Sequence, residues 1–208
     1  MKIAIPGLVL VAACGTNEST SNECRPLASP ADNFESPGLA CDGWGTLLHG
    51  QTAYRKDGAL VIDNPGFPDR CIDGYDMSRG LTIQLRHVTF ASDDGSATLS
   101  VELAHDPSLS GNFRGGLDLT GDGMLVADDD FGPVGQREYV RGEMSWWRVL
   151  PTTIDNKPAL SSEYSSDGIT WSTLGSAVVH SGTSLAHATV AIYLENASVS
   201  LESMNCAP

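Results

Sequence analysis

Basic residues are scarce in this sequence. Its 208 residues include 12 Lys and Arg against 26 Asp and Glu, which gives a formal net charge of −14 at pH 7. Nucleic-acid binding relies on clustered Lys and Arg, and electrostatic docking on anionic lipid needs the same residues. The composition therefore argues against a nucleic-acid partner and against charge-driven membrane binding, whereas it suits solubility or cation binding.

Long hydrophobic runs are also missing. A membrane-spanning helix needs roughly 20 apolar residues, but the apolar run near the start covers only residues 3–11 and contains Pro6 and Gly7. Together with Lys2 before it and small residues after it, this run is typical of an export signal. A signal of this kind is removed, so we exclude residues 1–13 from the folded domain.

The residue that follows this signal is a cysteine. Val11, Ala12, Ala13 and Cys14 resemble the lipobox of bacterial lipoproteins, although a plain secretory signal also has small residues here. The resemblance implies cleavage before Cys14 and its acylation, and several acyl chains anchor a protein stably. Cleavage also removes Lys2, the single charged residue of the signal, and leaves a charge of −15. Gly15 after the lipid attachment site implies the outer membrane of a bacterial cell envelope.

Motifs for catalysis and for transition metals are absent. The five histidines are scattered, and the sequence has neither a Cys-x-x-Cys pair nor a Gly-x-Ser-x-Gly elbow, nor a phosphate-binding loop followed by Lys. We therefore predict no catalytic residue, and we expect a protein that is not an enzyme.

Four cysteines remain if Cys14 is acylated. An even number in an oxidising compartment favours disulfides, and Cys24, Cys41, Cys71 and Cys206 allow three pairings. We favour Cys24–Cys206, because the two chain ends often meet in a β-sandwich, and Cys41–Cys71, which closes a local loop. Four free buried thiols are the alternative.

The chain divides into three parts. Residues 14–30 combine the acylated cysteine with a stretch rich in Ser, Thr, Asn and Glu that has no periodicity; it is typical of a flexible tether. Residues 31–208 are long enough for one domain with a substantial core.

The domain sequence predicts β-strands. Apolar and polar residues alternate with a period of two in residues 81–86, 99–103, 190–194 and 198–202, and residues 59–62 form a short apolar run. Turn residues separate such segments at 93–95, 120–123 and 166–168. No stretch has a sustained helical period, so we expect an all-β sandwich or barrel.

Three segments resemble the concanavalin A-like lectin/glucanase family, whose jelly-roll sandwiches include laminin-G-like modules. They span most of residues 33–205 and occur in the family's order. They are Asn33-Phe34-Glu35 with Gly43-Trp44-Gly45 and residues 58–62, then residues 146–149, and finally residues 163–171 with their Asp-Gly turn and Trp171.

The resemblance implies a fold of two antiparallel sheets in a jelly-roll sandwich and a carbohydrate site on the concave face or in the rim loops. Fold alone does not fix function. The family's glucanases carry a Glu-x-Asp-x-x-Glu run on one strand, which places alternate carboxylates on one face. The sequence has no such run, and the consecutive Asp128, Asp129 and Asp130 would point to alternating faces.

Aromatic residues are the candidates for ligand binding. Trp146 and Trp147 are adjacent, so on a strand they face opposite sides. If Trp147 faces the core, Trp146 and Arg148 share the other face, where an indole beside a guanidinium could bind a sugar; burial of both indoles is the alternative. The candidate ligand-binding set is Trp146, Arg148, Trp44 and Tyr54.

One segment matches part of a calcium loop. Asp118, Thr120 and Asp122 provide oxygen donors at alternate positions, and Asp129 stands at the twelfth position, where Glu is usual. An ion here would be structural. The alternative is a plain hairpin with its turn at residues 121–123.

These observations lead to two main hypotheses and a third, weaker one, an unrecognised hydrolase, which would need carboxylates or a Ser/His pair to converge in one cleft. The first is an exported, membrane-anchored lipoprotein that displays a non-catalytic β-sandwich and binds a polysaccharide. The second is a structural or protein-interaction module of the cell envelope without a sugar ligand. The exposure of Trp146 is expected to help to separate them.

Overall fold

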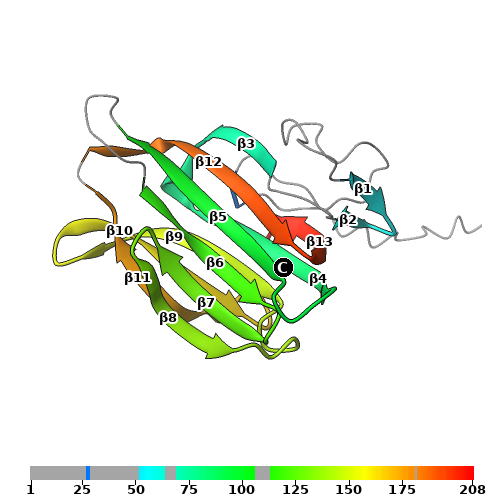
Figure 1. Cartoon of the computed structure of the whole chain (residues 1–208). Helices are drawn as coiled ribbons and strands as arrows, with labels where there is room; N and C mark the ends of the chain where they lie inside the picture. The colour runs from blue at the N-terminus through cyan, green and yellow to red at the C-terminus, as the bar shows by residue number, and fades with distance from the viewer. Residues whose placement is uncertain (1–26, 29–51, 64–68, 106–112, 181) are drawn as a thin grey trace, which may run out of the picture.

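The protein folds as two packed antiparallel sheets. The computed structural model describes residues 27–28, 52–63, 69–105, 113–180 and 182–208, and Figure 1 shows the strands of one sheet lying over those of the other. The two-sheet antiparallel sandwich predicted from the sequence is therefore confirmed. Within the described ranges, no helix is long and apolar enough to cross a membrane.

One sheet has seven strands and the other has six. In spatial order the seven are β1 (Thr52–Lys56), β2 (Ala59–Asp63), β13 (Ala197–Met204), β4 (Leu81–Phe90), β9 (Trp146–Ile154), β10 (Lys157–Ser165) and β11 (Ser172–Val178). The six are β3 (Asp69–Tyr75), β12 (Thr183–Glu195), β5 (Ser96–His105), β6 (Phe113–Thr120), β7 (Met124–Asp129) and β8 (Gly132–Glu138). A short 3-10 helix, η1 (Met77–Arg79), joins β3 to β4.

The predicted alternation places one face of each strand in the core. Leu99, Val101 and Leu103 of β5 are at most 1% exposed, and they face the apolar side chains of the seven-stranded sheet in one continuous core. Trp147 is buried in the same core and donates its indole N–H to the carbonyl oxygen of Met144 at 3.0 Å. Burial of this apolar surface is the main stabilising contribution to the fold.

Two glycines allow the sheets to meet at one edge. A Cβ on Gly135 of β8 would lie 1.9 Å from the carbonyl oxygen of Leu174, and one on Gly175 of β11 would lie 2.9 Å from Val134 Cγ2. Only residues without a side chain permit so close an approach of two backbones. The edge strands β8 and β11 therefore cover each other.

A buried polar clamp joins the two sheets at the end of β13. The Tyr75 hydroxyl donates to the Gly80 carbonyl oxygen at 2.7 Å and accepts from Nδ2 of Asn205 at 2.9 Å. Asn205 Oδ1 accepts the Thr82 N–H at 2.9 Å, and the Thr82 carbonyl accepts the Asn205 N–H at 2.7 Å. Because Tyr75 belongs to β3 and Thr82 to β4, these bonds cross between the sheets.

The same clamp binds the start of the domain. The Leu27 N–H donates to the Asn205 carbonyl oxygen at 2.7 Å, and the Ala28 side chain is part of the core. Leu27 and Ala28, which stand before the predicted domain start at residue 31, are thus in contact with the described domain.

We predict that Tyr75→Phe lowers the free energy of unfolding by about 1–3 kcal/mol, because the Gly80 carbonyl and the Asn205 amide would each lose a buried partner. Urea unfolding at neutral pH measures the change. Tyr193→Phe, on the outer face of β12, is the control and should change stability by less than about 0.5 kcal/mol. Equal effects of the two substitutions would contradict the role of the clamp.

Stability is also expected to depend on alkaline pH. Burial raises the pKa of Tyr75 to about 12, outweighing the opposing effect of the Asn205 hydrogen bond. Since the folded protein then holds a proton that the unfolded chain loses near its ordinary pKa of 10, the free energy of unfolding falls between about pH 10 and pH 12. Titration of Tyr75→Phe should show a smaller fall over this interval, and an identical fall would refute the assignment.

Candidate functional site

The outer face of the seven-stranded sheet carries Trp146 and Arg148, as the alternation on β9 predicts. Trp146 is nevertheless only 5% exposed. A Cβ placed on Gly168 would lie 2.9 Å from Trp146 Cε2 and 3.2 Å from Pro208 Cγ, so the β10–β11 turn packs against the indole and the chain end lies beside that turn. Trp146 therefore offers no open ring face for stacking in this structure.

The covering turn is shaped by its own side chains. Oδ1 of Asp167 accepts the N–H groups of Ile169 at 2.8 Å and Thr170 at 2.7 Å, and Oγ of Ser165 accepts the Gly168 N–H at 2.9 Å. The backbone bonds from Thr170 and Ile169, followed by the Ser165 hydroxyl, lower the pKa of Asp167 to about 2. Gly168 has φ of +71°, a conformation that favours glycine.

Arg148 is engaged by its own neighbours. Its Nε and Nη2 each lie 2.6 Å from Oε2 of Glu163 on β10, and its guanidinium carbon lies 3.9 Å from the centre of the Trp171 ring. Ser161 also donates to Glu163 at 3.1 Å. The cluster joins β9, β10 and the start of β11, and it fixes the guanidinium while the Arg148 side chain stays 24% exposed.

Tyr54 lies on β1, at the edge of this sheet. It stands at the margin of an open depression. Its hydroxyl donates to Oδ2 of Asp63 at 3.0 Å, and its side chain is 39% exposed. Asp63 lines a depression of about 340 Å³ together with residues at the end of β4 and the start of β13. The lining residues are Asp63, Thr89, Phe90, Ala91, Asn196, Ala197 and Ser198.

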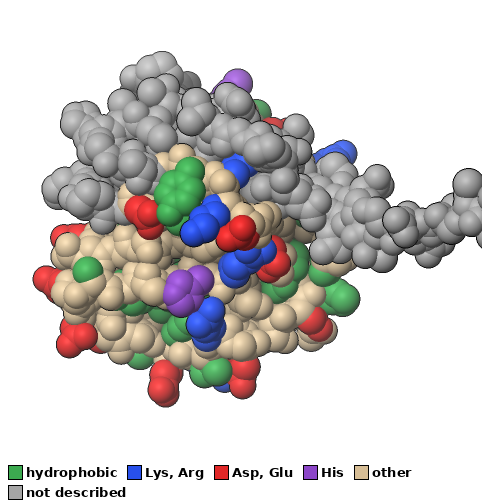
Figure 2. All heavy atoms as spheres, turned by 90° about the vertical axis from the view of Figure 1, so that its right-hand side faces the viewer, with side chains coloured by type: hydrophobic (Ala, Val, Ile, Leu, Met, Phe, Trp, Pro, Cys, Tyr) green, Lys and Arg blue, Asp and Glu red, His purple; other side chains and the backbone are tan. Residues whose placement is uncertain are grey.

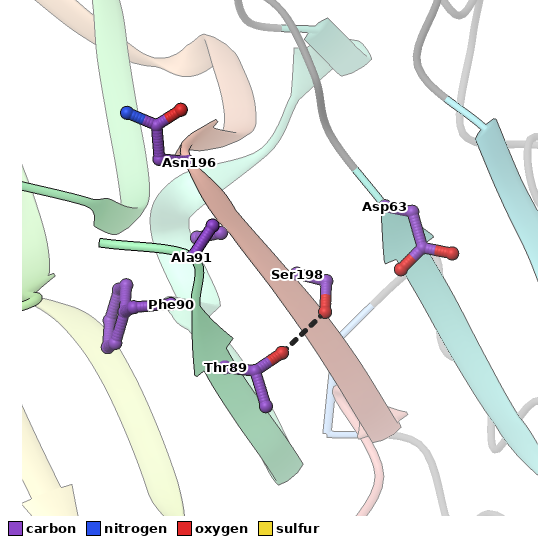
Figure 3. A pocket seen from close by; sticks show the side chains of 7 residues that line it. Asp63, Thr89, Phe90, Ala91, Asn196 and Ser198 are labelled. Carbon is purple, nitrogen blue, oxygen red and sulfur yellow. Dashed lines mark hydrogen bonds between the residues drawn. The ribbon is translucent and has the colours of Figure 1, made fainter.

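The registers of three strands assemble the depression. Ser198 of β13 pairs with Asp63 of β2 on one side and with Thr89 of β4 on the other. The Thr89 and Ser198 hydroxyls are hydrogen-bonded to each other at 2.7 Å, and Figure 3 shows this pair with Asp63 on the neighbouring strand β2 and Asn196 at the start of β13. The Phe90 ring lies on the opposite side of β4 from the Thr89 side chain.

Asp63 also influences the tyrosine. The hydrogen bond to its carboxylate is the largest cause that raises the pKa of Tyr54 above its ordinary value. The tyrosine consequently stays protonated and its ring stays neutral under physiological conditions. The site thus combines an accessible aromatic ring with one carboxylate, one amide and two hydroxyls.

The structure separates the four predicted ligand-binding residues. Trp146 and Arg148 share β9, whereas Tyr54 lies on β1, with β2, β13 and β4 between them. Trp44 lies outside the described residues. Asp63, Thr89 and Ser198 were not predicted; their common signal is a polar residue on the outer face of each of three neighbouring strands.

The predicted calcium loop is a hairpin in this structure. The Asp118 side chain accepts from the Thr98 hydroxyl at 2.7 Å on β5, Asp122 accepts from the Thr120 hydroxyl in the β6–β7 turn, and Asp129 accepts the Phe131 N–H at 2.8 Å. These side chains serve three different local structures. Across the described ranges, no group of three or more His, Cys, Asp or Glu residues could hold a metal ion.

The outer face of the six-stranded sheet carries a second polar cluster. Arg114 of β6 donates to the Ser100 hydroxyl at 3.2 Å and lies over the Tyr193 ring at 5.0 Å. Burial raises the pKa values of Asp118 and of Asp128, while Arg114 opposes both shifts. The Arg114 guanidinium thus offsets part of the free-energy cost of burying two carboxylates. The role of this cluster is therefore structural.

The predicted lipid attachment and disulfides involve Cys14, Cys24 and Cys41, which lie outside the described residues. Cys71 lies on β3, and its side chain is not described. Cys206 is 4% exposed, and its Sγ lies 3.4 Å from the Met204 carbonyl oxygen. Both pairings, and lipid attachment at Cys14, stay predictions.

Comparisons with known proteins define no family for this chain. No family model and no curated protein matches it. Among solved structures, one similar chain is described as a functionally unknown protein from Saccharomyces cerevisiae; the two are 18% identical, with a TM-score of 0.35, over 80% of this chain and 97% of the other. The resemblance to concanavalin A-like proteins therefore stays a prediction.

We predict that Gly168→Ala lowers the free energy of unfolding by at least about 1 kcal/mol, because a left-handed residue with a Cβ is strained and this Cβ would press on Trp146. Gly142→Ala is the matched control, since a Cβ there meets nothing within 4 Å. Urea unfolding compares the two variants. If Gly168→Ala is as stable as Gly142→Ala, the close packing of this turn against Trp146 does not contribute to stability.

Proposed function

We propose that this chain is an exported lipoprotein, anchored through Cys14, whose non-catalytic β-sandwich binds carbohydrate in the depression beside Tyr54. The observation that supports this function best is the pairing of the accessible Tyr54 ring with the Asp63 carboxylate at the margin of that depression. Asn196, Ser198 and Thr89 add polar groups around it.

The chemistry of these groups suits a sugar. A pyranose has an apolar face that packs on an aromatic ring, and hydroxyls around its edge that both donate and accept hydrogen bonds. Tyrosine supplies an apolar body with a polar tip, while a carboxylate accepts and an amide does both. A few placed polar groups at a concave surface are typical of small-ligand sites.

The charge pattern on the surface fits the same class of partner. Arg86 and Glu202 pair at 3.3 Å, and on the face seen in Figure 2 basic and acidic side chains are interspersed. A nucleic-acid site would gather basic side chains. The proposed partners are therefore a glycan and, through the lipid anchor, a membrane. Neither nucleic-acid binding nor catalysis is part of the proposal.

The proposed anchor and disulfides agree with the described chain end. Leu27 is bonded to Asn205; in the sequence, Cys24 stands three residues before Leu27, and Cys206 directly follows Asn205. A Cys24–Cys206 bond would fasten the anchored end of the chain to β13. In the chain-entropy model, a loop of this length contributes roughly 5 kcal/mol.

The burial of Trp146, which is 5% exposed, and the exposed apolar side chains elsewhere favour the second hypothesis. Phe131, in the β7–β8 turn, is 84% exposed, and Ile169, in the β10–β11 turn, is 74% exposed. Exposed apolar residues can mark protein contacts when they gather in a patch. A module that docks on another envelope protein would use the side chains of these two turns, whereas a glycan-binding module would use the Tyr54 depression.

Binding of neutral oligosaccharides by the full chain in detergent tests the proposal. Tyr54→Ala should weaken glycan binding about tenfold or more, because it removes both the stacking surface and the hydroxyl at Asp63. Phe131→Ala, at an exposed turn, should leave the affinity unchanged. Isothermal titration calorimetry with a panel of glycans measures both. If the folded chain binds no glycan, or if Phe131→Ala abolishes binding and Tyr54→Ala does not, the carbohydrate function is wrong.

A further inference from the structure

We propose that the Tyr54 depression selects glycans that carry a free amine, such as deacetylated amino sugars, over neutral N-acetylated sugars and over sugar acids. This inference rests on the carbohydrate function proposed above and specifies its substrate class. It is carried by the charge and hydrogen-bonding groups of the depression.

Among the described residues that line the depression, Asp63 is the one charged side chain. The others are uncharged: Thr89, Phe90, Ala91, Asn196, Ala197 and Ser198. A ligand that enters therefore meets a negative group without a basic partner in the lining. Such a site favours a cationic group on the ligand and disfavours a carboxylate.

The Asp63 carboxylate retains capacity for a ligand. One of its oxygens accepts the Tyr54 hydroxyl at 3.0 Å, and an ionised carboxylate has about four lone-pair positions. An ammonium group brings three donors, and hydrogen bonds between two charged groups are roughly twice as strong as neutral ones. Asp63 can thus hold Tyr54 in place and still bind an amine.

Among the described residues, the basic side chains of Arg86 and Lys56 are not paired with Asp63. Arg86 is committed to Glu202 at 3.3 Å and to the Asp57 carbonyl oxygen at 2.7 Å. Lys56 lies at the far end of β1, since Asp63 pairs with Thr52, about 13 Å away at about 3.3 Å per residue.

The net charge of the whole protein also favours cationic ligands. The net charge of −14 gives the surface a negative potential that attracts cationic ligands and repels anionic ones at long range, an effect that salt screens. This general attraction is not specific to the depression. A test must consequently separate the contribution of Asp63 from that of any other carboxylate.

The test compares three tetrasaccharides: glucosamine tetramer, its fully N-acetylated form and tetragalacturonate. Calorimetry with the full chain in detergent should show that the free-amine tetramer binds about tenfold tighter than the acetylated one, and that the uronate binds more weakly than either. In Asp63→Asn the difference between the two glucosamine tetramers should shrink to about twofold or less.

Asp155→Asn is the matched control, because it removes one exposed carboxylate from the β9–β10 turn, where Asn tolerates the φ of +50°; it should keep the tenfold preference. Equal binding of both glucosamine tetramers, or a preference that survives Asp63→Asn, would overturn the inference while leaving carbohydrate binding intact. If the folded chain binds none of the three, both the inference and the proposed function fail.

Discussion

The hydrogen bonds of Asn205 determine how the two sheets and the two chain ends are joined. Its side chain is 1% exposed, and with Tyr75 and Thr82 it connects β3 of one sheet to β4 of the other. Buried polar groups are tolerated only when they are paired, so this network is satisfied only when both sheets are in their native register. Because Leu27 bonds to the same residue, the start of the domain depends on it as well.

Local alternation predicted most of the central strands because each buries one face and exposes the other. It gives no signal for β8, whose residues Gly132–Glu138 are half-buried or exposed and whose pairing depends on glycines at a close approach. It gives no signal for the clamp either, since Tyr75 and Asn205 lie far apart in the sequence. Their meeting depends on the order of strands, which is a property of the whole fold.

In the candidate site too, the local sequence pattern predicts some features, whereas others depend on contacts between residues far apart in the sequence. The period of β9 places Trp146 and Arg148 on one face correctly, but their exposure depends on the turn at Gly168, which packs against the indole, and on Glu163, which binds the guanidinium. Tyr54 is recognisable from the sequence as an aromatic candidate. Its partner Asp63 and the hydroxyls of Ser198 and Thr89 are not, because the registers of β2, β13 and β4 bring them together.

Strand β13 connects the clamp to the depression. Ser198 stands near its start and Asn205 directly follows its end, so the two lie about 23 Å apart at about 3.3 Å per residue. The N-terminal chain meets the domain at Asn205. In a chain anchored at Cys14, the anchored segment would therefore reach the domain near one end of β13, and the Tyr54 depression would lie near the other end. A binding site so placed is accessible to a polymer outside the membrane, whereas one beside Asn205 would compete with the tether for space.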